Sequence, residues 1–187
     1  MEENNVQTNG VKIKKRGIEM AFREIAIEEL GFNPFTKIGK EWLLITAGDE
    51  NGYNTMTASW GGVGIMWGKN VATIYIRPQR YTKEFVDKND RLTLTFYKEE
   101  YRKALNFCGT KSGRDYDKDK EAGLTPFYVD GTTAYEEADM VFICKKQYHQ
   151  EMKPECFDAA ENDEKWYAQK DYHTMYIVEI EKVLIKE

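Results

Sequence analysis

The chain is poor in the residues and patterns that mark several common classes of protein. Its only cysteines, Cys108, Cys144 and Cys156, lie far apart and form none of the close pairs that are typical of zinc or dithiol sites. No stretch approaches the roughly 20 consecutive apolar residues of a membrane-spanning helix. The basic run at residues 14–16 is followed by no apolar segment. We therefore expect a soluble, unexported protein of the cytoplasm, with reduced thiols and no metal site.

An excess of basic charge is also missing. The 27 lysines and arginines are outnumbered by 32 acidic residues, which gives a formal net charge of −5. Binding to a nucleic-acid backbone needs an electropositive surface, so neither DNA nor RNA is expected as a partner. The chain does contain 41% hydrophobic and 13% aromatic residues over 187 positions, enough for the core of one domain. We expect a single domain over residues 1–187, with a flexible segment at 1–15.

Short β-type runs separated by turn signals fill the body of the sequence. They predict strands at 42–47, 54–60, 71–76, 91–96, 134–146 and 173–185. Helices are expected at 82–88, 101–108 and 154–161, the second of them burying Ala104, Leu105 and Cys108. The last strand is apolar on both faces for part of its length, as in a barrel wall that is covered by helices or by a partner subunit. The simplest assembly is a mainly β fold, one barrel with peripheral helices.

The most informative run is the polar strand Asn54–Trp60. An Asn-Gly pair at 51–52, between two apolar runs, predicts that this strand forms a hairpin with the preceding one. Strand alternation divides its residues between two faces, Thr55, Thr57 and Ser59 against Asn54, Met56, Ala58 and Trp60. Either face is able to line a site, and threonine is also simply a good strand former. The register and the role of this strand stay open at this point.

Two arginines and a hydroxyl, Arg77, Arg80 and Thr82, follow directly after the strand at 71–76. Thr82 is a candidate N-cap for the helix at 82–88, where a phosphate would meet two guanidinium groups and a helix end. Each charged hydrogen bond contributes about 1.5–3 kcal/mol, against about 0.3–1 kcal/mol for the helix end. The alternative is a solvated basic strand end paired with Asp87 or Asp90. Together with the polar strand, this pattern points to a phosphorylated flat cofactor, flavin mononucleotide (FMN).

Two glycine-rich motifs do not support other nucleotide sites. Residues 61–64 are no dinucleotide fingerprint, because Trp67 holds the position of the third required glycine. Residues 109–113 are no Walker loop, because Thr110 stands where a glycine must precede the lysine. Lys111 either points a cation at a ligand from this flexible loop or is solvated among neighbouring charges. The residues alone favour neither interpretation.

Four separated blocks between Asn33 and His149 stand in a characteristic order, at 42–48, 54–62, 77–82 and 109–115. Together they resemble the flavin reductase-like proteins, which have an FMN-binding split β-barrel of Greek-key type and include the flavoredoxins. Blocks in the right order are far more specific than any one of them. The resemblance implies a homodimer, with FMN lying against the barrel near the subunit boundary.

The resemblance also implies the residues of the FMN site. The expected contacts of the isoalloxazine ring are Asn54, Thr57, Ala58, Ser59 and Trp60, and those of the ribityl phosphate are Arg77, Arg80, Tyr81 and Thr82. Lys111 and Ser112 would approach from their loop, and His149 would lie near the flavin. The alternatives are a core role for Trp60 and a surface position for His149, while His173 is interpreted as structural. No catalytic residue is expected, because the flavin carries the hydride chemistry.

Three functions are compatible with these residues. The first is an oxidoreductase that takes hydride from NADH or NADPH onto FMN and passes electrons to an unknown acceptor. The second is a flavoredoxin-like carrier whose FMN stays bound without efficient NAD(P)H turnover. The third is a non-catalytic split-barrel module for another ligand or partner. No independent nicotinamide motif separates them, and the segment 154–172 either covers the flavin or packs as an ordinary helix.

Overall fold

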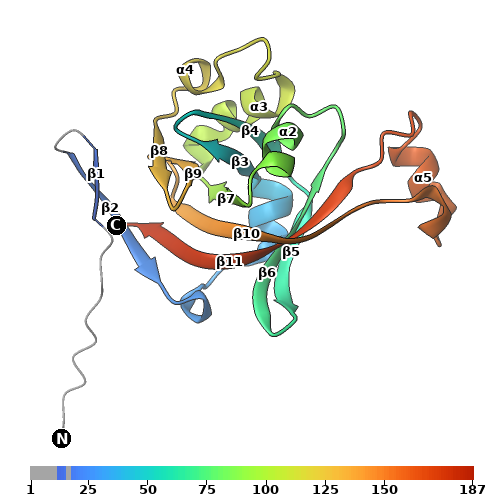
Figure 1. Ribbon diagram of the computed structural model, residues 1–187, viewed down its shortest axis with the longest axis horizontal. Helices are drawn as coiled ribbons and strands as arrows, with labels where there is room; N and C mark the ends of the chain where they lie inside the picture. The colour runs from blue at the N-terminus through green and yellow to red at the C-terminus, as the bar shows by residue number, and fades with distance from the viewer. Residues whose placement is uncertain (1–11, 16–17) are drawn as a thin grey trace, which may run out of the picture.

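The computed structural model describes residues 12–15 and 18–187, most of which form antiparallel strands with helices at the periphery (Figure 1). The strands are β1 Lys12–Lys15, β2 Ile18–Ile25, β3 Leu43–Asp49, β4 Gly52–Ala58, β5 Gly61–Met66, β6 Lys69–Ile76, β7 Arg91–Phe96, β8 Pro126–Val129, β9 Thr132–Tyr135, β10 Met140–Glu151 and β11 Thr174–Lys186. The helices are α1 Pro34–Thr36, α2 Thr82–Lys88, α3 Arg102–Thr110, α4 Lys118–Ala122 and α5 Ala160–Trp166, with shorter turns η1 Ile27–Glu29, η2 Lys37–Glu41, η3 Glu99–Tyr101 and η4 Pro154–Cys156. The expected mainly β class is confirmed.

Strand β11 organises the sheet. One of its edges pairs with β10 over almost its whole length. Its other edge is shared, because residues 174–179 pair with β6 and residues 183–186 pair with β2. The strand order is therefore β1-β2-β11-β10-β7-β3-β4, with β6 and its partner β5 branching from β11. This division of the sheet places the end of β6 and the end of β4 in the same part of the molecule.

The central strands are buried on both faces. Phe142 and Cys144 of β10 lie in the larger hydrophobic cluster, whereas the alternate residues Val141 and Ile143 lie in a second cluster. Helix α3 covers this second cluster with the three residues that were expected to face inward, Ala104, Leu105 and Cys108. Each fully buried large apolar side chain contributes about 1.5–3 kcal/mol of transfer free energy. The two clusters thus hold the barrel wall rigid between its core and its outer helices.

Three predicted elements differ from the structure. The strand expected at 134–146 is divided into β9 and β10, because a turn closed by the hydrogen bond from Ala138 N to Tyr135 O interrupts it. The glycine-rich segment expected to be a break is strand β5. Gly61 (φ +155°) is needed there, since a Cβ atom would lie 2.7 Å from the carbonyl oxygen of Thr73. The helix expected at 154–161 is replaced by η4 and the later helix α5.

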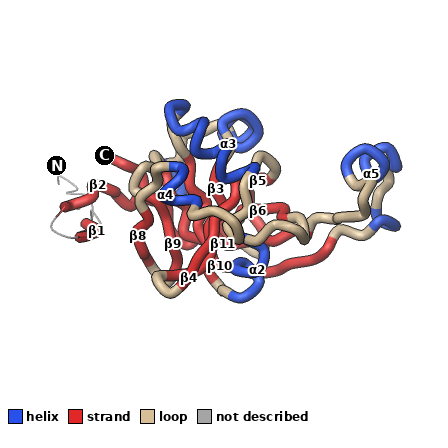
Figure 2. The backbone as a smooth tube through the Cα atoms, turned by 90° about the horizontal axis from the view of Figure 1, so that it is seen from above, coloured by secondary structure: helices blue, strands red, loops and turns tan. Residues whose placement is uncertain are grey.

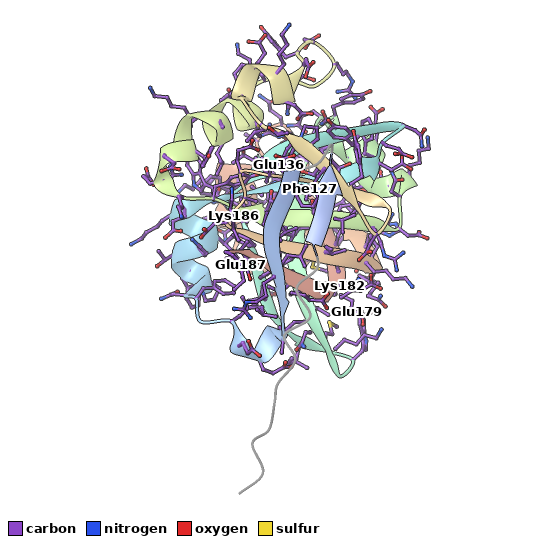
Figure 3. The ribbon with its side chains drawn as sticks, turned by 90° about the vertical axis from the view of Figure 1, so that its left-hand side faces the viewer. Phe127, Glu136, Glu179, Lys182, Lys186 and Glu187 are labelled. Carbon is purple, nitrogen blue, oxygen red and sulfur yellow. The ribbon has the colours of Figure 1, made fainter. Side chains whose placement is uncertain are left out.

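The expected hairpin is present, with Asp49 opposite Gly52 at the turn between β3 and β4. Of the N-terminal segment expected to be flexible, residues 1–11 lie outside the described residues and 12–15 form β1, which pairs with β2. Figure 3 shows this side of the barrel, with Phe127 and Lys186 next to β1 and β2. The ring of Phe127 lies 5.5 Å from that of Phe22. The pairing and this ring contact fix β2 on the body of the molecule.

The segment Met152–His173, which we name the arm, extends from the ends of β10 and β11. Figures 1 and 2 show its helix α5 at one side of the molecule, beyond the barrel. Stacked rings stabilise the arm, with the centroids of Tyr167 and Tyr172 4.9 Å apart. None of the helices in residues 12–15 and 18–187 is long and apolar enough to span a membrane.

Candidate functional site

Three segments that are distant in sequence meet at the side chain of Asn54 on β4. Its Nδ2 atom donates a hydrogen bond to Thr82 Oγ1 (2.6 Å) at the start of α2. The loop after α3 approaches from the other side, so closely that a Cβ atom on Gly113 would lie 1.9 Å from Asn54 Oδ1. Only glycine fits there. Asn54 therefore joins the polar strand, the arginine segment and the lysine loop rather than lining a cavity itself.

The segment between β6 and α2 supplies the two arginines. Arg80 Nη1 donates to the carbonyl oxygen of Gly109 at 2.5 Å, so that this guanidinium is fixed against the end of α3. Arg77 instead reaches the arm, where it pairs with Asp171 and donates to the carbonyl oxygen of Trp166 at 2.8 Å. The two arginines thus differ in their surroundings, because among the described residues Arg77 pairs with a carboxylate and Arg80 does not.

Thr82 does not cap α2 as expected. The N-cap position is held by Tyr81, whose side chain makes no capping hydrogen bond, and Thr82 is the first residue of the helix. The Thr82 hydroxyl is instead engaged by Asn54. The position of Thr82 is fixed by tertiary contact, and the electrostatics of this part of the site come from its basic side chains.

The sequence analysis missed a basic residue, Lys118 at the start of α4. Its side chain is only 6% exposed, and its Nζ atom donates to the carbonyl oxygens of Thr55 (2.6 Å) and Cys108 (2.8 Å). The neighbouring Asp119 anchors α4, because it accepts hydrogen bonds from Tyr53 and Tyr135. A protonated amine carries three N–H groups, so one remains for a ligand after the two carbonyls are satisfied.

Arg80 and Lys118 are held in this place at an electrostatic cost. Burial, and then the charge of Arg77, lowers the pKa of the Arg80 guanidinium. Burial also lowers the pKa of Lys118 to about 8, and the charge of Arg80 acts in the same direction. Among the described residues neither of the two forms an ion pair; their partners are backbone carbonyls. Such a pair of cations favours the binding of an anion.

The cations border a cavity of about 360 Å³, which we name the basic pocket. Six predicted residues line it, Arg77, Arg80, Tyr81, Thr82, Lys111 and Ser112, together with Met56, Gln79, Thr110, Gly113 and Lys118. Lys111 is exposed, with its Nζ atom 5.2 Å from the centroid of the Tyr116 ring. The size, the charge and the hydroxyl groups of the basic pocket suit a phosphate group.

A second cavity, of about 240 Å³, adjoins the first and is named the aromatic pocket. It shares Met56, Arg77 and Arg80 with the basic pocket. The remaining lining comprises the predicted residues Thr57, Ala58, Ser59 and Trp60, with Tyr75, Trp166 and His173. The two pockets therefore form one groove, basic at one end and aromatic at the other.

The arm contributes two residues of the aromatic pocket that the sequence analysis did not assign to the site. The ring centroids of Trp166 and His173 lie 5.0 Å and 5.1 Å from that of Trp60. His173 Nδ1 shares a hydrogen bond of 2.8 Å with the hydroxyl of Tyr167. Burial, and then the charge of Arg77, lowers the pKa of His173 to about 4, so its imidazole is neutral at pH 7. His173 thus presents a neutral ring to the pocket.

His149 is not brought to this groove. It is exposed on β10 and stacks on Tyr176, with the ring centroids 5.8 Å apart. Among the described residues that line the basic and aromatic pockets, His149 does not occur. His149 thus lies outside both pockets of this chain, and its position near the flavin stays a prediction.

A comparison with protein families decides the affiliation. The sequence model described as the flavin reductase like domain matches residues 35–187. The chain belongs to the flavin reductase-like family. The resemblance seen in the sequence blocks is thereby confirmed, while curated proteins provide no match.

Solved structures of this family share the split-barrel fold. An FMN-binding domain of a flavin reductase-like enzyme from Shewanella baltica has a TM-score of 0.64 at 14% identity, covering 90% of this chain and 79% of that one. A flavoredoxin of Desulfovibrio vulgaris has a TM-score of 0.61 at 21% identity, covering 78% and 69%. Nitrilotriacetate monooxygenase component B from Bacillus cereus has a TM-score of 0.61 at 12% identity, covering 87% and 81%. At these identities the likeness shows the fold alone.

The buried position of Lys118 predicts how stability depends on pH. Because its pKa falls from 10.5 in the unfolded chain to about 8 in the fold, the unfolded chain binds the extra proton between these values. The effect of Lys118 on the free energy of unfolding is thus most favourable above pH 10.5, where its amine is neutral in both states. The free energy of unfolding falls as the pH falls to 8, by at most about 1.4 kcal/mol per pH unit. Urea unfolding at pH 8 and 10 should show a stability gain for the parent chain that Lys118→Met lacks. An equal change in the free energy of unfolding of both proteins contradicts the assignment of this pH dependence to Lys118.

Proposed function

We propose that this protein is an FMN-binding oxidoreductase that takes hydride from NADH or NADPH and passes electrons to an acceptor. The observation that carries the proposal is the presence of the buried Lys118 and the partly buried Arg80, two cations without an ion-pair partner among the described residues, at one end of a groove whose other end is aromatic. A phosphate dianion compensates both charges, and a flat ring system suits the aromatic end. FMN combines these two groups in one molecule.

The residues present fit FMN in a defined order along the groove. Arg80, Lys118 and Lys111 would hold the phosphate, and Arg77 would contribute from its position between the two pockets. Ser59 and Trp60 would border the ring. Bound FMN supplies the hydride chemistry, and the protein sets its orientation and electronic surroundings. Since His173 is neutral at pH 7, the positive charge acting on the cofactor comes from the basic pocket.

The relatives support this proposal and also define its alternatives. Among solved structures of the same fold, one is a flavoredoxin and another an FMN-binding protein from Thermus thermophilus with bound p-hydroxybenzaldehyde. A flavoredoxin-like role here would require FMN to stay bound without efficient NAD(P)H turnover. A non-catalytic module would have no need for a buried and a partly buried cation at the end of a groove, which favours a cofactor-binding protein.

A homodimer is part of the proposal, supported by an apolar surface on the β5–β6 hairpin. Ile65 is 73% exposed and Trp67 is 56% exposed, with Val63 and Met66 exposed next to them. The ring of Tyr148 on β10 extends this surface, with its centroid 6.5 Å from that of Trp67. Contiguous exposed apolar side chains mark protein interfaces. We also place the protein in the cytoplasm, in accordance with its three free cysteines.

Substitutions in the basic pocket test the phosphate assignment. Arg80→Ala removes a partly buried cation and should weaken FMN binding about ten- to a hundredfold, corresponding to about 1.5–3 kcal/mol for a charged contact. Lys111→Ala removes an exposed cation and should cost only a few-fold, less than about 1 kcal/mol. Lys103→Ala, an exposed lysine of α3, controls for net charge and should change little. Titration by flavin fluorescence measures all three, and losses of equal or reversed size contradict the assignment.

The visible spectrum of the FMN-loaded protein tests the reaction. Under anaerobic conditions NADH or NADPH should bleach the flavin bands promptly, because the proposal has hydride passing from nicotinamide to FMN. Bands that persist until dithionite is added would indicate the carrier instead. A protein that takes up no FMN at all would exclude both functions.

A further inference from the structure

A third cavity, larger than the two pockets of the groove, also borders Trp60. Its volume is about 680 Å³, and we name it the apolar cavity. Ser59, Trp60 and Tyr75 border it as well as the aromatic pocket. The opposite wall is formed by α1 and η2, where Ile38 is buried and Phe35 is 86% exposed. The apolar cavity thus adjoins the ring end of the groove and opens to solvent beside Phe35.

The lining of the apolar cavity differs in chemistry from that of the groove. None of the described residues that border it carries a charge. Its polar side chains are the hydroxyls of Ser59, Tyr75 and Tyr167, of which Tyr167 is already engaged by His173. Glycines at 39, 61 and 62 leave the wall without side chains at three positions. An ionised ligand would lose its hydration here without gaining a counter-charge.

The size of the apolar cavity suits a small organic molecule. Ligand sites typically have volumes of about 300–1,000 Å³ with mostly apolar walls and a few polar groups. The ring of Trp60 and the side chain of Ile38 offer a surface for a planar molecule, and a free hydroxyl is available at Tyr75 for one polar contact. The pyrophosphate of a dinucleotide finds no cation among the described residues that line these walls.

We propose that the apolar cavity is a second ligand site, which binds an uncharged, planar aromatic molecule next to the flavin. The inference rests on the proposed function, since Trp60 borders both this cavity and the aromatic pocket assigned to the FMN ring. The inference adds a second binding site to the proposed function. Its ligand class follows from the absence of charged side chains among the described residues that line the cavity. In this proposal the ligand and FMN are bound at the same time, one in each of two adjoining cavities.

Two fluorescent probes with one skeleton test the inference. N-phenyl-1-naphthylamine is neutral, and 8-anilino-1-naphthalenesulfonate is the same molecule with a sulfonate. Titrated into the FMN-loaded protein, in which the basic pocket is filled, the neutral probe should bind one site per chain at least tenfold more tightly than the sulfonate. Equal affinities, or no saturable binding of the neutral probe, overturn the proposal.

A substitution locates the probe. A Cβ atom on Gly39, at the cavity wall, meets nothing within 4 Å, so Gly39→Phe introduces a ring there without a backbone clash. This change should weaken binding of the neutral probe at least tenfold. Gly31→Phe is the matched control, because Gly31 also has open space at Cβ and lies outside the cavity lining. Unchanged probe binding in Gly39→Phe overturns the assignment.

The FMN affinity of the same proteins separates this inference from the proposed function. Gly39 borders neither the basic nor the aromatic pocket, so Gly39→Phe should bind FMN as the parent chain does. If FMN binds normally and the probe does not, only the second site is wrong. If the parent chain binds no FMN, the proposed function fails, whereas probe binding that Gly39→Phe abolishes would still establish the cavity as a site.

Discussion

One buried and one partly buried cation at the same pocket are the constraint on which the site depends. Lys118 is buried and Arg80 is partly buried, and both are held by the backbone carbonyls of Gly109, Thr55 and Cys108. Removing a charge from water costs several kcal/mol unless a counter-charge compensates it. The lowered pKa values of both groups express this cost. A dianionic phosphate relieves it, which fixes the direction in which FMN would lie along the groove.

The strand pairing of the sheet brings the parts of this site together. Because β11 pairs with β10 on one edge and with both β6 and β2 on the other, the end of β6 is held beside β4. The contact of Asn54 with Thr82, and the close approach of Gly113, then join three remote segments. The arm, which leaves the barrel between β10 and β11, returns Trp166 and His173 to the aromatic end. The site at the polar strand is therefore assembled from several elements that are remote in sequence.

Much of this was readable from the sequence wherever the signal is local. Strand β7 and helix α2 have the predicted bounds, since apolar alternation and helical periodicity act over neighbouring residues. The exceptions depend on tertiary position. Lys118 stands in a highly charged loop and looks solvated until Asp119 is seen to anchor α4. His173 joins the site only through the fold of the arm, and His149 lies outside both pockets of this chain. Strand β5 was missed because glycine is a weak strand former.

The comparison of FMN with riboflavin tests the central claim most directly, because the two ligands share the ring and differ in the phosphate. Equilibrium titration of the protein with each ligand at pH 7 measures what the basic pocket contributes. FMN should bind at least a hundredfold more tightly than riboflavin, as expected for two or more charged contacts of about 1.5–3 kcal/mol each. Equal affinities would contradict this claim, since the two cations would then have no part in holding the cofactor.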